Sequence, residues 1–170
     1  MKKLKEESFY LNKEFNSIIT DIINNEEFQK MKKITHHGIT RFNHSLRVSY
    51  YTYLVTKKLK LNYVDATRAA LLHDFFSDET ESMKTKKALK EHPRIALENS
   101  KKYYELNKMQ EDIILKHMYP VTTKMPTYKE SWIVDIVDDV ASLYERTYSV
   151  NKQFKTAVRF LFIMLLIKFK

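Results

Sequence analysis

The chain has 170 residues, 44% of them hydrophobic and 13% aromatic, so one domain of ordinary size can bury a substantial core. One glycine and three prolines are too few turn residues for a sandwich or barrel, and they favour long helices with short connections. The absence of cysteine excludes disulfides and thiolate metal sites. The net charge of +9 includes scattered lysine pairs, which are typical of a solvated basic surface; a patch for phosphorylated ligands or nucleic acid is the alternative.

The N-terminal residues lack the apolar segment of a secretory signal peptide, so we expect a cytoplasmic protein. We expect a first helix over residues 8–33, because apolar residues recur there at spacings of three and four. These residues are Phe9, Phe15, Ile18, Ile19, Ile22, Ile23 and Phe28. The only glycine, Gly38, follows in THHGIT, where we expect a positive φ or a close approach of the backbone.

Thr40 can cap the next helix, which should run to about Leu59. One face of this helix carries His44, Val48, Tyr51, Val55 and Leu59. A third helix fits residues 63–76. Its inner face is small and ends in a histidine: Ala66, Ala69, Ala70 and His73. Such alanines would let a neighbouring helix approach closely.

After the polar residues 77–88, a helix restarts in EHPRIALENSKKYYEL with Pro93 in its first turn, where a missing N–H costs nothing. KMQEDIILKHMY is the next helix, and it ends before a loop at 119–128 that holds two prolines. KESWIVDIVDDVASLYERTY forms a long amphipathic helix, and residues 152–168 form an apolar last one. Its unbroken run, 160–167, is too short to span a membrane and should pack into the core or contact a second copy of the chain. We therefore expect an all-α, single-domain bundle of about six to seven helices.

Four histidines lie in or beside four different expected helices: His44, His73, His92 and His117. All but His92 lie on apolar faces, and each one alone is more often a satisfied core residue than a metal ligand. Together they would each need a buried partner, and a shared metal supplies a partner to all of them. Imidazole nitrogen and carboxylate oxygen without sulfur suit a divalent ion such as Mn, Fe, Co, Ni or Zn.

A further carboxylate ligand should come from a later helix, where Asp135, Asp138 and Asp139 compete for the role. Asp138 is flanked by small and apolar residues in IVDDVAS, with Val134 and Ala141 on its own face, as expected of an inward-pointing ligand. Asp139 would then be a solvated neighbour, and Asp135 would either support the ligand or be a surface charge.

The order His44, then His73 and Asp74, then Asp138 resembles the HD superfamily of metal-dependent phosphohydrolases, which are helical bundles with ligands on separate helices. The motifs HSLRV, AALLHD, EHPRIALEN, IILKHMYP and IVDDVAS extend the resemblance over about residues 36–145. The blocks HHG, HPRIALEN, HMYP and ESWIV are most similar to small HD-domain hydrolases of low-GC Gram-positive bacteria.

The resemblance implies two metal ions. One set of ligands would be His44, His73, Asp74 and Asp138; the other would be Asp74, His92 and His117, with Asp74 bridging. A water held between the ions would become hydroxide near neutral pH and attack phosphorus in line. Asp78, four residues after Asp74, lies where some HD nucleotidases place a catalytic carboxylate; a helix-capping role is the alternative.

Cationic side chains near the ligands are expected to bind substrate phosphate: His37, Arg41, Arg47, Arg94 and Lys116. Each also fits a surface or structural role. Tyr119 or Trp132 would stack on a base or pack beneath the loop. The sequence thus predicts a hydrolase of a small phosphorylated molecule, a nucleotide. It does not decide which bond is cleaved, so a nucleotidase, a pyrophosphohydrolase and a phosphodiesterase all stay open. A regulatory metal- or nucleotide-binding protein is the alternative, nucleic-acid binding is a weaker one, and homodimer formation is compatible with the apolar C-terminus.

Overall fold

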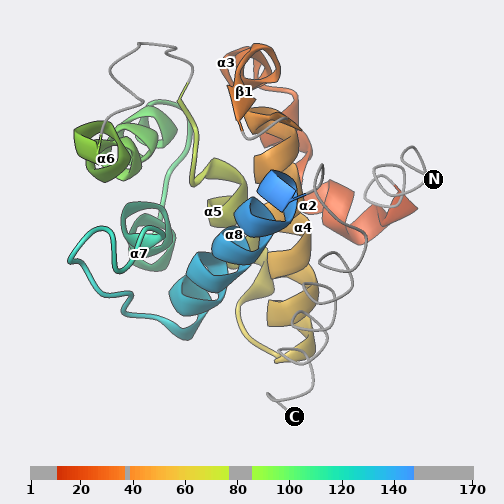
Figure 1. The fold of residues 1–170 in the computed structure, drawn as a ribbon. Coiled ribbons are helices and arrows are strands. Elements are labelled where there is room, and N and C mark those ends of the chain that lie inside the picture. Colours follow the sequence, from red (N-terminus) through yellow and green to blue (C-terminus); the bar gives the residue numbers. More distant parts are fainter. Residues whose placement is uncertain (1–10, 37–38, 77–85, 148–170) are drawn as a thin grey trace.

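The structure, a computed structural model, describes residues 11–36, 39–76 and 86–147 (Figure 1). These residues form seven α-helices, one 3-10 helix and one two-stranded ladder, which confirms the predicted all-α class. The elements are α2 (Lys13–Ile23), α3 (Glu26–Lys30), the 3-10 helix η1 (Met31–Lys33), β1 (Thr35–His36), β2 (Ile39–Thr40), α4 (Arg41–Lys58), α5 (Tyr63–Leu72), α6 (Lys86–Tyr103), α7 (Lys108–Lys116) and α8 (Lys129–Thr147). Among the helices in these ranges, none combines the length and the apolar character that crossing a membrane requires.

The continuous helix predicted over 8–33 is wrong within the described part of that range, because two adjacent asparagines divide it. Asn24 ends α2, and the side chain of Asn25 accepts the amide protons of Glu27 and Phe28 at 2.9 and 3.1 Å to start α3. Asparagine competes with the helix backbone in this way. Four residues of the predicted apolar face are nevertheless buried: Phe15, Ile19, Ile22 and Phe28. Ile18 and Ile23 are partly buried, and Phe9 lies outside the described residues.

A short antiparallel ladder precedes α4, although the sequence pattern indicates no strand. Thr35 pairs with Thr40 and His36 with Ile39, and two residues on each side are too few for an alternating pattern. Residues 37 and 38 lie outside the described residues, so the conformation expected at Gly38 stays a prediction. Thr40 caps α4 as predicted, with its Oγ1 accepting the amide proton of Asn43 at 3.2 Å.

Other helix boundaries also differ from expectation; α7, for example, ends at Lys116, three residues before the predicted end at Tyr119. α5 ends at Leu72, four residues before the predicted end, because the chain turns at His73 and Asp74. Pro93 lies inside α6 and not in its first turn, since the helix begins at Lys86. A proline in a helix interior leaves one hydrogen bond of the helix unmade. The apolar helix predicted at 152–168 lies outside the described residues.

The helices α4, α5 and α8 form the centre of the bundle. α4 packs against α5 and α8, and α7 packs against α5, α6 and α8. Figure 1 shows α8 in the middle of the view, with α4 on one side and α6 and α7 on the other. Three alanines on α5 are fully buried at these contacts, as the sequence predicts: Ala66, Ala69 and Ala70. The helices α4, α6, α7 and α8 all pack against α5, so that residues distant in sequence come together around it.

Candidate metal centre

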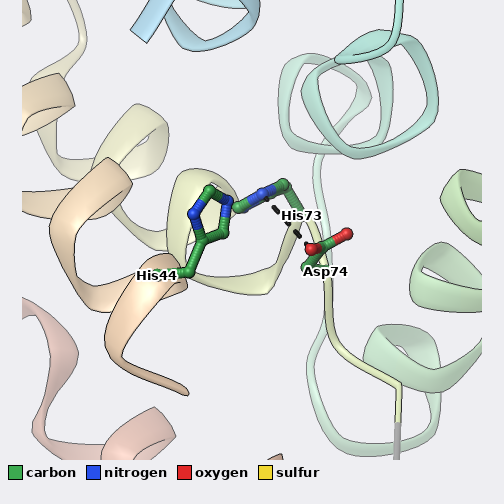
Figure 2. A group of neighbouring side chains, drawn as sticks. All are labelled: His44, His73 and Asp74. Carbon is green, nitrogen blue, oxygen red and sulfur yellow. Dashed lines mark ion pairs between the residues drawn. The ribbon is translucent and has the colours of Figure 1, made fainter. Parts of the chain in front are cut away.

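Six titratable side chains from separate elements meet in the interior near the end of α5. They are His44 from α4, His73 and Asp74 after α5, His92 from α6, His117 after α7, and Asp138 from α8. None is more than 7% exposed. They form three overlapping triads whose ligand atoms lie within 4.8 Å of one another: His44, His73 and Asp74; His73, His117 and Asp138; and Asp74, His92 and His117. Figure 2 shows the first triad, with the dashed line joining His73 to Asp74.

His73 and His117 are oriented by the ends of their helices. Each is the residue after the last helical position, and each places its Nδ1 against a carbonyl three residues back, Ala70 at 2.7 Å and Ile114 at 2.8 Å. The last carbonyls of a helix lack intrahelical partners, so this contact satisfies an otherwise unpaired acceptor. A carbonyl only accepts, so Nδ1 carries the proton and Nε2 presents a lone pair when the ring is neutral.

His44 is held between two carboxylates of α8. Its Nε2 lies 2.9 Å from Oδ1 of Asp138, and its Nδ1 lies 2.8 Å from Oε2 of Glu145. Burial by itself lowers the pKa of His44, but the hydrogen bonds to Asp138 and Glu145 outweigh it and raise the pKa to about 10. The proton on Nε2, which faces Asp138, occupies the position that a cation would take.

The remaining contacts centre on Asp74. Its Oδ1 lies 3.4 Å from Nε2 of His92 and 3.9 Å from Nε2 of His117, whereas its Oδ2 lies 3.9 Å from Nε2 of His73. The two oxygens therefore face different imidazoles. Arg41 adds a positive charge, with its Nε 3.9 Å from Oδ2.

Three features indicate that these residues fit a divalent metal. Nε2 of His73 is buried and has no hydrogen-bond partner among the described residues; carboxylate oxygens of Asp138 and Asp74 lie 3.7 and 3.9 Å away. Nε2 of His92 and Nε2 of His117 lie 2.9 Å apart. Two nitrogens bound to one ion at about 2.0–2.1 Å would be separated by about 3 Å. The donors are imidazole nitrogens and carboxylate oxygens, which suit Mn, Fe, Co, Ni or Zn.

The protonation states of His117, Asp74 and Asp138 also fit metal binding, which requires neutral imidazole and ionised carboxylate; His44 would lose its Nε2 proton when an ion takes that place. Burial, followed by the charges of His73 and His92, lowers the pKa of His117 to about 3. Burial raises the pKa of Asp74, but the imidazoles of His73 and His92 outweigh it and hold that pKa well below its ordinary value. Burial also raises the pKa of Asp138, but the charge of His73 and the hydrogen bond to His44 outweigh it and lower that pKa.

Of the cations predicted to bind phosphate, Arg41 lies beside the cluster. Its Nη1 donates to the carbonyl oxygen of Phe76 at 3.0 Å, and its guanidinium lies 3.7 Å from the centre of the Phe76 ring. Arg47 contacts Glu145. His37 and the predicted catalytic residue Asp78 lie outside the described residues, so their roles stay predictions.

The other two predicted phosphate-binding cations pair with carboxylates outside the cluster. Arg94 is exposed and pairs with Glu91 and Glu98 on its own helix. Lys116 pairs with Asp112 one turn earlier and donates to the Thr127 hydroxyl at 2.6 Å. These intramolecular contacts are what a surface or structural role of Arg94 and Lys116 would give. Their phosphate-binding roles stay predictions.

One residue of the site, Glu145, has no role in the prediction from the sequence. Glu145, the partner of His44, follows Asp138 by two helical turns, and this spacing on one face was the available signal. Asp135, which the sequence offers as a competing ligand or a supporting charge, is buried and accepts the amide proton of Tyr119 at 3.1 Å. Burial and the neighbouring Asp139 raise the pKa of Asp135 to about 7.

Comparison with known proteins identifies one family. The family model of the HD domain matches residues 41–143, more than half of the chain. The match includes every residue of the three triads. No curated protein and no solved structure matches the chain.

Proposed function

Because this chain belongs to the HD-domain family, a superfamily of metal-dependent phosphohydrolases, we propose that it hydrolyses a phosphate ester or phosphoanhydride of a small substrate, a nucleotide. The reaction would take place at the six-residue cluster described above. We propose two divalent ions. Their ligands would be His44, His73, Asp74 and Asp138 for one ion, and Asp74, His92 and His117 for the other.

The observation that carries the proposal is the position of Asp74. One of its oxygens faces His73, and the other faces His92 and His117. A carboxylate that turns its two oxygens toward two sets of imidazoles is suited to bridge a pair of ions about 3.5–4 Å apart. The adjacency of His73 and Asp74 in sequence would then have a physical reason: His73 would bind one ion and Asp74 would be a ligand to both.

When bound, the ions would supply Lewis acidity, which lowers the pKa of water and offsets the charge of phosphoryl oxygens. The protein holds the carboxylates of Asp74 and Asp138 ionised and keeps bulk water away from them by burial. Arg41 would bind a phosphoryl oxygen, since its buried guanidinium lies beside Asp74. Its charge would also offset that of the substrate.

An aromatic pair supports a nucleotide as the substrate. Tyr119 follows the ligand His117 by two residues and packs edge to face on Trp132, with ring centres 5.4 Å apart. Both side chains are partly exposed. A nucleobase can stack on such rings. The basic net charge of +9 favours a polyanionic ligand in the same way.

The test is a screen of phosphate and pyrophosphate release from nucleotides, with Mn²⁺, Co²⁺, Ni²⁺ or Zn²⁺ added to metal-stripped protein. We expect hydrolysis of at least one nucleotide that depends on the added ion. A protein that binds none of these ions and hydrolyses none of the nucleotides would contradict the proposal. Metal binding without any hydrolysis would favour the regulatory alternative.

A further inference from the structure

Glu145 is a buried glutamate that joins α8 to two residues of α4. Its Oε2 lies 2.8 Å from Nδ1 of His44, and its Oε1 pairs with Nη1 of Arg47. The Glu145 side chain is 1% exposed. A buried carboxylate is costly unless both oxygens find partners, and here each oxygen has one.

Helical geometry places these groups in register. Asp138 and Glu145 are seven residues apart, which is two turns on one face of α8. Ala141 lies between them on that face and is buried. His44 and Arg47 are three residues apart on α4, again on one face. His44 thus meets a carboxylate of α8 at each of its ring nitrogens.

The need for a side-chain partner follows from the position of His44 in its helix. His73 and His117 lie at helix ends, where a free backbone carbonyl accepts their Nδ1 proton. His44 lies in the first turn of the 18-residue helix α4, where the carbonyls are engaged in the helix. A partner for its Nδ1 therefore has to come from another element, and Glu145 supplies it.

We propose that Glu145 is a positioning residue for the metal centre. It fixes His44 with the proton on Nδ1, so that Nε2 is directed at an ion, and Arg47 holds the Glu145 carboxylate in that orientation. An anionic partner also makes the imidazole a stronger donor to a metal. This inference rests on the proposed function, since it presupposes that His44 binds an ion. It assigns Arg47 to the support of His44, in place of the phosphate contact that the sequence suggests.

The competing explanation is that Glu145 only fastens α8 to α4. Both explanations allow a loss of stability in a Glu145 variant, so stability does not discriminate between them. Metal affinity and the visible absorption of bound Co²⁺ do, because they respond to the ligand field at the ion. Glu130 offers a matched control: it is a buried glutamate on α8 that accepts the Asn62 amide proton at 3.1 Å and contacts none of the six ligands in the described structure.

The experiment is a titration of metal-stripped full-length protein with Mn²⁺ and with Co²⁺, for the wild type, Glu145→Gln and Glu130→Gln. Circular dichroism establishes that each protein is folded. We expect Glu145→Gln to bind about 10–100-fold more weakly and to alter the Co²⁺ absorption bands. Glu130→Gln should match the wild type in both. Should Glu145→Gln fail to fold, Arg47→Lys is titrated instead, and it should also bind more weakly, because one ammonium replaces the guanidinium fork.

Two outcomes overturn the inference. The first is wild-type affinity and absorption in the folded Glu145 or Arg47 variant. The second is an equal loss in Glu145→Gln and Glu130→Gln, because the effect would then come from removing a buried charge on α8. A wild type that binds neither ion contradicts the proposed function itself, and the inference falls with it.

Discussion

His73 and His117 occupy equivalent positions at the ends of α5 and α7, and each donates its Nδ1 proton to the carbonyl oxygen three residues earlier. The two rings lie edge to face, with centres 4.8 Å apart. Two helix ends thus bring two Nε2 atoms into the same cluster, in which the ligand atoms of His73, His117 and Asp138 lie within 4.8 Å of one another. The orientation of these candidate ligands is set by the backbone, so it should persist when the ions are removed.

Replacing Asp74, the carboxylate proposed to bridge the two ions, should have the largest effect. In Asp74→Asn the side chain keeps its size but loses the charge that faces His73 and His92. We expect both ions to be lost and the activity to fall about 1000-fold or more, since metal catalysis contributes several kcal/mol. Elemental analysis and phosphate release measure the two effects. Loss of activity with both ions retained would contradict a bridging role.

Adjacent aspartates provide a matched pair on α8. Asp138 is buried with Oδ1 2.9 Å from His44, whereas Asp139 is exposed. Asp138→Asn should weaken metal binding at least about tenfold, and Asp139→Asn should leave it unchanged. Calorimetric titration with Mn²⁺ measures both. Equal effects in the two variants would exclude Asp138 as the ligand on this helix.

Substitutions of Arg41 and Arg94 should differ in their effect on KM, because Arg41 is buried beside Asp74 and Arg94 is exposed. Arg41→Lys should raise KM about tenfold or more, because a lost charge-assisted hydrogen bond is worth about 1.5–3 kcal/mol. Arg94→Lys should leave KM unchanged, since Arg94 is exposed and pairs with Glu91 and Glu98. Steady-state kinetics with the best nucleotide measures both. An unchanged KM for Arg41→Lys would remove this residue from the substrate site.

Ligand binding should stabilise the fold. A divalent ion at a hundred times its Kd adds about 2.7 kcal/mol to the free energy of unfolding. For a chain of this size that corresponds to a rise of about 5–10 °C in Tm. Thermal unfolding of chelator-treated protein with and without Mn²⁺ measures the shift, and Mg²⁺ serves as the control because it prefers oxygen ligands. No shift with any transition ion would contradict the metal centre.

The raised pKa of Asp135 predicts a pH dependence of stability in metal-stripped protein. Burial, then Asp139, raise this pKa to about 7, so the folded state holds a proton that the unfolded chain releases above its ordinary pKa of 3.8. Stability from this group is therefore present below about pH 4 and is lost as the pH rises to 7. The side chain of Asp135→Asn cannot ionise. The Tm of this variant, measured relative to that of the wild type, should therefore increase as the pH is raised from 4 to 8.

Asp21 supplies a control of opposite sign for that measurement. Its hydrogen bonds to Arg68 outweigh partial burial and lower its pKa, so its stabilisation is present above pH 3.8 and is lost as the pH falls. Asp21→Asn should therefore be less stable than the wild type at pH 7, and the difference should shrink on acidification. The same trend in the Asp135 and Asp21 variants would contradict the pKa assigned to Asp135.

Apolar periodicity is a local signal and predicted the helical class, and histidines on separate helices indicated a shared metal. The full set of six candidate ligands followed from the resemblance to the HD superfamily. Glu145 was missed for a physical reason. Its charge is typical of a solvated helix end, and its burial depends on Arg47, which lies 98 residues away in sequence. The division between α2 and α3 did have a local signal, the pair Asn24 and Asn25, but apolar spacing continues across it.

Asp138 and Glu145 of α8 contact the two ring nitrogens of His44, so the geometry of the candidate metal centre depends on the position of α8 along its own axis. A shift of α8 by one residue along its axis moves Asp138 and Glu145 together by about 1.5 Å, which would break both contacts. Asp112 holds the beginning of α8 by accepting hydrogen bonds from the Thr127 amide at 2.9 Å and from the Ser131 hydroxyl at 2.7 Å. Asp112, a residue of α7 outside the six candidate ligands, thus helps to fix the axial position of α8, and a change at Asp112 would displace the carboxylates of Asp138 and Glu145 together.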